Sequence, residues 1–109
     1  MNAIVIPCAG DEPIEVIDLP DEAGARWARL RELVGGYLEA IRPPIAGTIA
    51  YIHDEGKAVD APRNEAATAL VDLWLGDYIA GPMVVCGLAG PDETSLTDEQ
   101  IVAVLGVMA

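Results

Sequence analysis

Four short motifs constrain the fold of this chain more than any other feature, because each one marks a change of backbone state. Each joins a glycine, a proline or a helix-capping side chain to the end of an apolar run. In chain order they are Val34-Gly35-Gly36-Tyr37, Pro62-Arg63-Asn64-Glu65-Ala66-Ala67-Thr68, Gly81-Pro82-Met83-Val84-Val85-Cys86-Gly87 and Ser95-Leu96-Thr97-Asp98-Glu99. Their spacing predicts short helices and short strands within one chain.

Runs of β-branched and other apolar residues predict about five or six short strands. A first hairpin is expected from residues 3–6 and 14–18, joined by turn residues at 9–13. Further strands are expected at 37–41 and 47–52, followed by a turn at 53–57, in which Gly56 can take a positive φ, and a brief return at 58–59. The continuous apolar run Met83-Val84-Val85-Cys86 predicts a central strand that is covered on both faces.

Three helices are predicted from apolar residues at helical spacing. The first begins near Asp21 and ends at Gly35-Gly36, with a buried stripe of Ala23, Trp27, Leu30 and Val34 and with Arg26, Arg29 and Glu32 facing outward. The second begins at Asn64 as its N-cap and ends at Gly76, with Ala67, Leu70, Val71 and Trp74 buried. The third follows a capping box at Thr97-Asp98-Glu99-Gln100 and buries Ile101, Val104, Leu105 and Met108.

These elements predict an α+β fold, with a mostly antiparallel or mixed sheet packed by the three helices. A length of 109 residues fits a single domain, here residues 1–109, and 52% hydrophobic residues are enough for a buried core. The longest apolar stretches are around five residues, much shorter than a membrane span, and no secretory signal is evident. We therefore expect no membrane partner and a cytoplasmic location.

Charge is the outlier of the composition. Eighteen acidic residues against six basic ones give a net charge of −12. Such a surface repels nucleic acid phosphates and anionic membranes, so direct binding to nucleic acid is not expected. It either keeps an apolar domain soluble or imitates the charge of a phosphate backbone.

No combination of residues predicts a catalytic centre, a metal site or a cofactor. His53 is the one histidine, and it is interpreted as a surface residue of a turn. Cys8 and Cys86 are interpreted as buried reduced thiols, and with one histidine they cannot form a standard zinc site. The adjacent acids Asp54-Glu55, Asp92-Glu93 and Asp98-Glu99 are assigned to solvated turns and helix starts, and Gly87-Leu88-Ala89-Gly90 to a flexible strand-to-helix connection.

The polar residues that could bind a ligand lie at the start of the second helix. Arg63, Asn64 and Thr68 surround a helix N-terminus that could hold an anionic group, although Asn64 is also expected to cap the helix. Tyr37 is the aromatic residue chosen to complete this candidate site, with Tyr51 and Tyr78 as further neighbours. The alternative is that these tyrosines are half-buried strand residues.

The four motifs, in this order, resemble the DUF3846 family, a domain of unknown function common in bacteriophages, plasmids and conjugative elements. The Gly-Gly-Tyr step, the Pro-x-Asn helix start, the Gly-x-x-Val-Val-x-Gly strand and the Ser-Leu-Thr helix start carry the resemblance, which implies no catalytic residue. It favours a non-enzymatic binding domain, monomeric or homodimeric, that acts inside the host cell. The domain would engage a host defence or regulatory protein through its acidic surface. The alternatives are a small-molecule or nucleotide-binding domain and an anti-restriction protein that imitates DNA.

Overall fold

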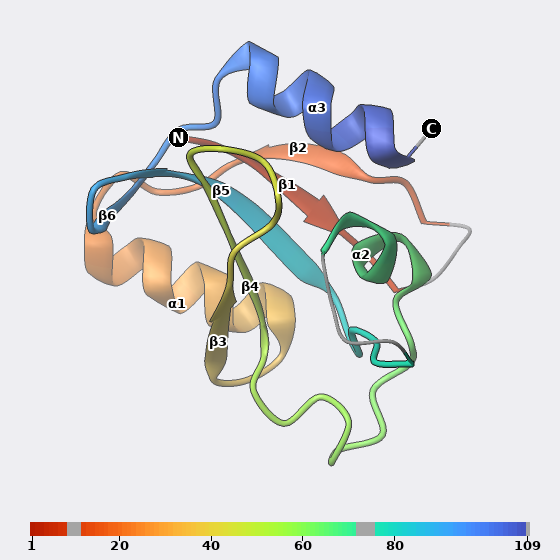
Figure 1. The fold of residues 1–109 in the computed structure, drawn as a ribbon. Coiled ribbons are helices and arrows are strands. Elements are labelled where there is room, and N and C mark those ends of the chain that lie inside the picture. Colours follow the sequence, from red (N-terminus) through yellow and green to blue (C-terminus); the bar gives the residue numbers. More distant parts are fainter. Residues whose placement is uncertain (9–11, 72–75, 109) are drawn as a thin grey trace.

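The computed structural model describes residues 1–8, 12–71 and 76–108. The elements in chain order are β1 (Asn2–Ile6), β2 (Glu15–Asp18), α1 (Ala23–Val34), β3 (Leu38–Ile41), β4 (Thr48–His53), α2 (Glu65–Leu70), β5 (Met83–Ala89), β6 (Asp92–Thr94) and α3 (Asp98–Met108). This order confirms the predicted α+β fold with three helices among the described residues (Figure 1).

All strands belong to one sheet, and every pairing in it is antiparallel. The strand order is β2-β1-β5-β4-β3, with β6 paired to the end of β5. The predicted first hairpin is confirmed, since Ile4 of β1 pairs with Val16 of β2. The central position of β5 is also confirmed, because it pairs with β1 on one side and β4 on the other. This order leaves β3 at one end of the sheet.

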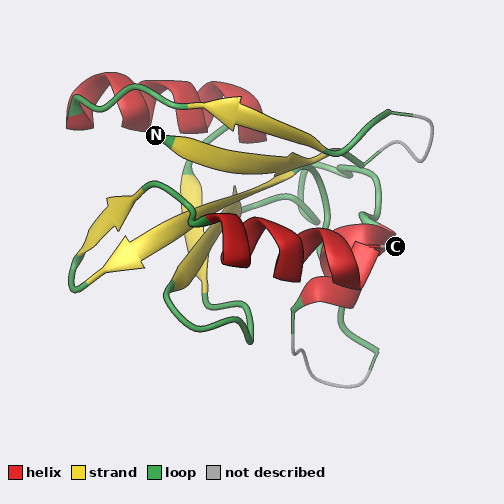
Figure 2. Cartoon of the chain, turned by 90° about the horizontal axis from the view of Figure 1, so that it is seen from above, coloured by secondary structure: helices red, strands yellow, loops and turns green. Residues whose placement is uncertain are grey.

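The helices cover the two faces of the sheet unequally (Figure 2). The α1 face has its own core, in which Leu30 and Val34 of the helix pack with Tyr51, Val84 and Cys86. The opposite face is covered by α2 and α3, and its core holds the alternate strand residues together with helix residues (Ile4, Ile6, Ala50, Ile52, Ala67, Leu70, Met83, Val85 and Val104). Successive residues of β5 therefore enter different cores, which is the period-two pattern of a strand buried on both faces.

The predicted helix boundaries are largely confirmed by their capping contacts. Gly35 ends α1 with φ 88°, in the left-handed region that glycine adopts without a steric penalty. Asn64 Oδ1 accepts from the amide of Ala67 at 3.0 Å, as an N-cap does. Thr97 and Gln100 exchange side-chain to backbone hydrogen bonds at 2.9 and 3.1 Å, which is the predicted capping box at the start of α3.

The predicted orientation of α1 is confirmed at Leu30 and Val34, which are buried, and is wrong in the first half of the helix. Arg26 was expected to face solvent but is buried, whereas Trp27 is 39% exposed and Ala23 is exposed. Arg26 lies on the side of α1 that faces the sheet because its guanidinium has hydrogen-bond partners there. Its Nε donates to Glu93 of β6 at 3.3 Å, and an Nη donates to the carbonyl of Asp21 at 2.8 Å. The stripe that faces the sheet is Arg26, Leu30 and Val34.

Two connections also differ from prediction. Residues 54–60 form a continuous turn, so the return strand at 58–59 is absent from the described structure. Gly56 does not have a positive φ; instead it allows a close approach, since a Cβ there would lie 2.7 Å from the carbonyl oxygen of Ala80. The expected flexible connection after β5 is a hairpin, the third of the sheet, in which Gly90 at φ 61° turns the chain into β6.

The predicted buried positions of α2 and α3 are met only in part. The helix α2 ends at Leu70, with Val71 as its C-cap, and not at Gly76 as predicted. Trp74, like residues 9–11 of the first turn, lies outside the described residues. In α3, Val104 is fully buried but Leu105 is 38% exposed, and the side chain of Met108 is not described. No helix in the described ranges is both long enough and apolar enough to cross a membrane.

Candidate functional site

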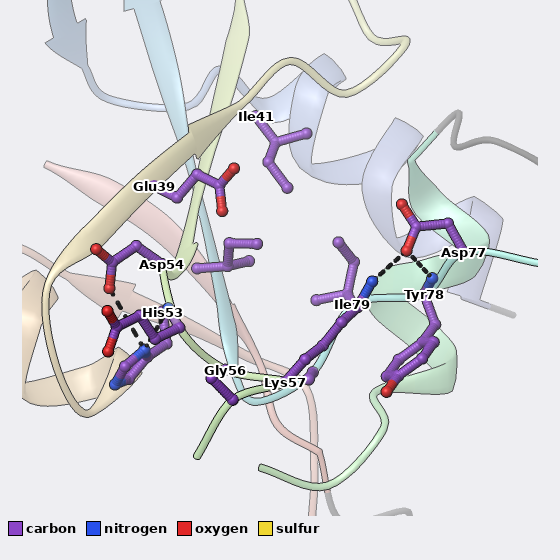
Figure 3. A pocket seen from close by; sticks show the side chains of 13 residues that line it. Glu39, Ile41, His53, Asp54, Gly56, Lys57, Asp77, Tyr78 and Ile79 are labelled. Carbon is purple, nitrogen blue, oxygen red and sulfur yellow. Dashed lines mark hydrogen bonds and ion pairs between the residues drawn. The ribbon is translucent and has the colours of Figure 1, made fainter. Parts of the chain in front are cut away.

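A cavity of about 440 Å³ opens beside the free end of the sheet, between the β3–β4 hairpin and residues 77–80. Ile41, Ile52 and Ile79 belong to its apolar lining. Figure 3 shows Glu39 and Ile41 of β3 on one side of the cavity and Asp77 and Tyr78 on the opposite side. Asp54, Glu55 and Lys57 come from the turn that follows β4.

Strand register and loop contacts bring these segments together. Glu39 pairs with Ile52 and Ile41 pairs with Ala50, so the side chains of Glu39 and Ile41 lie on the face that α2 and α3 cover. The segment after residue 76 is fixed by two backbone hydrogen bonds of 2.8 Å, from Asn64 to Ile79 and from Gly81 to Pro62. The cavity is thus built from parts of the chain that are distant in sequence.

The electrostatics of the cavity are acidic. Among the described residues that line it, Lys57 is the one lysine or arginine, and its charge is matched by an ion pair with Asp77. The hydrogen bond from Lys57, together with one from the Tyr78 amide, holds the pKa of Asp77 below its usual range. Among the described residues, Glu39 and Glu55 form no ion pair, so the rim keeps an excess of negative charge.

A stacked cluster of two cations and a tyrosine closes one side of the site. The Lys57 ammonium lies 4.5 Å and the Arg63 guanidinium 5.0 Å from the centre of the Tyr78 ring. Arg63 Nε is also paired with Glu65 at 2.6 Å. Cation–π contacts of this kind hold the ring and both side chains in place.

The structure brings together three of the four residues predicted to bind a ligand. Asn64 is 1% exposed, and its amide nitrogen donates to the carbonyls of Ile6 and Gly81 at 2.9 and 3.0 Å. The Thr68 hydroxyl donates to the Asn64 carbonyl at 2.7 Å and accepts from the Ile79 amide at 2.9 Å. Asn64 and Thr68 therefore join α2 to the sheet and to the cavity wall, and Arg63 packs on Tyr78. Their proposed role in ligand binding stays a prediction.

The fourth residue, Tyr37, lies in a different place. It is 73% exposed and lines a shallow groove of about 410 Å³ with Trp27, Arg31 and Leu38. Tyr51 is buried in the α1-face core, where the Trp27 ring meets it edge-on with ring centres 5.6 Å apart. Of the three tyrosines, only Tyr78 neighbours Arg63, so the predicted tyrosine patch around the start of α2 is not formed.

His53 lies beside an acid, with Nδ1 3.6 Å from Asp54 Oδ1, and among the described residues no hydrogen bond or ion pair joins it to Cys8 or Cys86. His53 is the last residue of β4, not a surface turn residue; its ring is 15% exposed and lies against Gly36, and Nδ1 accepts from the Glu55 amide at 2.9 Å. Cys86 is fully buried, and burial raises its pKa to about 12. Cys8 is only partly buried, contrary to prediction, and burial raises its pKa as well. In the described parts of the chain, both thiols are free and no acid, cysteine and histidine cluster could hold a metal ion.

Sequence reasoning missed the residues that form the cavity. Glu39, Ile52 and Asp77 were not selected, because each is unremarkable in its own segment. One signal was available: Glu39 is a charged residue in a four-residue strand, on the same face of the strand as the apolar Ile41. A charge in that position is typical of an edge strand.

Comparison with known proteins adds a family but no activity. No curated protein and no solved structure matched the chain. The family model of a domain of unknown function, DUF3846, matches residues 1–108. The match spans all four sequence motifs and the whole of the described fold, so the chain belongs to the DUF3846 family.

Proposed function

We propose that this chain is a non-enzymatic binding domain that recognises a basic segment of a partner protein through the cavity beside β3. The observation that carries the proposal is the rim of Glu39, Asp54 and Glu55 on a cavity that also has an apolar lining. Apolar area supplies affinity, and the acids, of which Glu39 and Glu55 form no ion pair among the described residues, select a positively charged partner. The net charge of −12 acts in the same direction by speeding the approach of basic partners.

The biological setting is a further part of the proposal. The four motifs resemble a family common in bacteriophages and mobile elements, and on that resemblance we infer that the partner is a host protein in the cytoplasm, such as a defence or regulatory factor. A nucleic-acid-binding protein of the host presents the basic surface that this site selects. If that basic surface is the site where the partner binds DNA, this chain would act by imitating DNA.

The test is affinity capture from host cells with three forms of the protein. The first is the natural chain, and the second has its cavity rim neutralised by Glu39→Gln, Asp54→Asn and Glu55→Gln. The third is a matched control in which three exposed acids elsewhere are neutralised by Glu12→Gln, Glu15→Gln and Asp92→Asn. A partner retained by the natural and control forms and lost by the cavity form supports the proposal; equal capture by all three contradicts it.

A second candidate is a small cationic or neutral ligand in the same cavity. Its volume of about 440 Å³ falls within the size range of small-molecule sites. Nucleotides are disfavoured here because the acidic rim repels phosphate groups. A thermal-shift screen tests this candidate, since a ligand at a hundred times its Kd adds about 2.7 kcal/mol to the free energy of unfolding. A screen of amines and polyamines without any shift would remove it.

A further inference from the structure

The strand β3 has a free outer edge with a different binding surface on each side. It is the last strand in the order β2-β1-β5-β4-β3, and its described partner is β4 alone. The acid-rimmed cavity lies on one face, where Glu39 and Ile41 point. The groove of Trp27, Arg31, Tyr37 and Leu38, which we call the aromatic groove, lies on the other.

The backbone of β3 is suited to accept another strand. The Asp54 amide donates to the Tyr37 carbonyl at 3.0 Å, so Tyr37 and Asp54 form a hydrogen-bonded pair at the start of the β3–β4 ladder. Hydrogen-bonded and non-hydrogen-bonded positions alternate along an antiparallel pair. The N–H and C=O groups of Glu39 and Ile41 therefore face β4, while those of Leu38 and Ala40 point outward.

The two surfaces match the alternation of side chains along an added strand. A residue placed opposite Leu38 has its side chain on the aromatic groove, and the next residue, opposite Glu39, has its side chain over the acidic cavity. Tryptophan, tyrosine and arginine are the residues enriched where interfaces bind most strongly, and the aromatic groove contains all three.

From this geometry we propose that the partner binds by adding an extended segment to the outer edge of β3, with apolar and basic residues alternating along it. The inference rests on the proposed function and adds the binding mode and the sequence pattern of the partner. Main-chain hydrogen bonds to Leu38 and Ala40 give affinity, and the two side-chain surfaces give specificity.

A second copy of this chain does not fit the same edge. Pairing β3 with β3 would bring the acidic rims of two chains together, each with a net charge of −12. Like charges opposite each other destabilise a sheet, whereas a lysine or arginine opposite Glu39 is favourable. Charge complementarity therefore selects a basic segment of another protein.

The probes are two synthetic peptides of about ten residues with identical composition, one alternating valine and arginine and one with the valines and arginines in separate blocks. The protein is used as the natural chain, as Ala40→Pro and as Ala40→Ser. Proline removes the outward N–H of residue 40 without removing a bond to β4, and prolines are tolerated on edge strands. Serine keeps that N–H, and circular dichroism establishes that both variants fold.

The expected result is that the alternating peptide binds about tenfold or more tightly than the blocked one, and that Ala40→Pro, but not Ala40→Ser, removes most of this advantage. Equal binding of the two peptides, or an unchanged affinity in Ala40→Pro, overturns strand addition. If strand addition is overturned in this way but the peptides no longer bind once Glu39, Asp54 and Glu55 are neutralised, the proposed function stands without strand addition. If neither peptide binds the natural chain, both proposals fail.

Discussion

At the residue scale, Asn64 is the polar side chain on which the structure depends most. It caps α2 and also satisfies the carbonyls of Ile6 and Gly81 inside the fold. Asn64→Ala removes the cap and the side-chain donor to two buried carbonyls, so we expect a loss of about 2–4 kcal/mol in the free energy of unfolding. Thr97→Ala removes only an exposed cap and should cost about 1 kcal/mol. Urea denaturation measures both, and equal losses would contradict the account of Asn64.

The buried pair of Arg26 and Glu93 gives a second residue-scale prediction. Both side chains are at most 10% exposed, so Arg26→Met leaves an unpaired carboxylate in the interior and should cost about 3 kcal/mol. Adding Glu93→Gln removes that charge and should restore part of the loss. Arg29→Met is the control, because Arg29 is exposed and paired only with exposed Glu32. Chemical denaturation measures the free energy of unfolding of the three variants. A double variant that is less stable than Arg26→Met would contradict the pairing.

The reactivity of the two cysteines can be tested by thiol modification. Burial raises the pKa of Cys86 to about 12, so its thiolate is scarce as well as inaccessible. We expect one accessible thiol, that of the partly exposed Cys8, to react in the folded protein and two to react after denaturation. A Cys8→Ser variant provides the control and should show no reaction until it unfolds. Rapid native modification of that variant would place Cys86 at the surface.

At the scale of the elements, the start of α1 should control part of the acid sensitivity of the fold. The amides of Ala25 and Gly24 donate to the carboxylate of Glu22 and hold its pKa below the usual value of 4.5. Because the pKa is lowered on folding, the stabilisation by the Glu22 carboxylate is fully present above pH 4.5. It is lost as the pH falls through the lower pKa of the folded state. Glu22→Gln should therefore show a smaller fall in Tm between neutral and acidic pH than the natural chain does. Glu15→Gln, on β2, is the control and should leave the slope unchanged.

The elements also show how far the sequence determines the structure. Helix ends and strand positions were predicted because Gly35, Asn64 and Thr97 act within a few residues of their own position. The burial of Arg26 in α1 was not predicted, because it depends on a hydrogen bond to Glu93, a residue 67 positions away. The strand β6 was missed for a related reason, since its residues Asp92-Glu93-Thr94 lack the apolar alternation that marks a strand.

The candidate site could be predicted even less. Its acidic lining combines Glu39 of β3, Asp54 and Glu55 of a turn, and Asp77 after α2, and no sequence pattern links these segments. Local reasoning instead selected Arg63, Asn64 and Thr68, whose contacts stabilise the wall of the cavity. Only the assembled sheet places β3 at its end and thereby gives the cavity an open edge.

At the scale of the whole molecule, the net charge of −12 is a cost to the folded state as well as an attraction for basic partners. Acids at close spacing repel one another, and added salt screens that repulsion. We expect Tm to rise between low salt and about 0.5 M sodium chloride, and binding of a basic peptide to weaken over the same range. Opposite signs for these two effects are the signature of excess acidic charge. A Tm that falls with salt would indicate that attractive ion pairs dominate the surface.

The most direct test of the central claim is to map the binding of the alternating valine–arginine peptide by amide chemical shifts. The account predicts that perturbed amides gather in β3, in residues 54–57 and in residues 77–80, with Leu38 and Ala40 gaining protection from hydrogen exchange. Perturbations confined to other acidic segments, such as the starts of α1 and α3, or spread evenly over the surface, would contradict it.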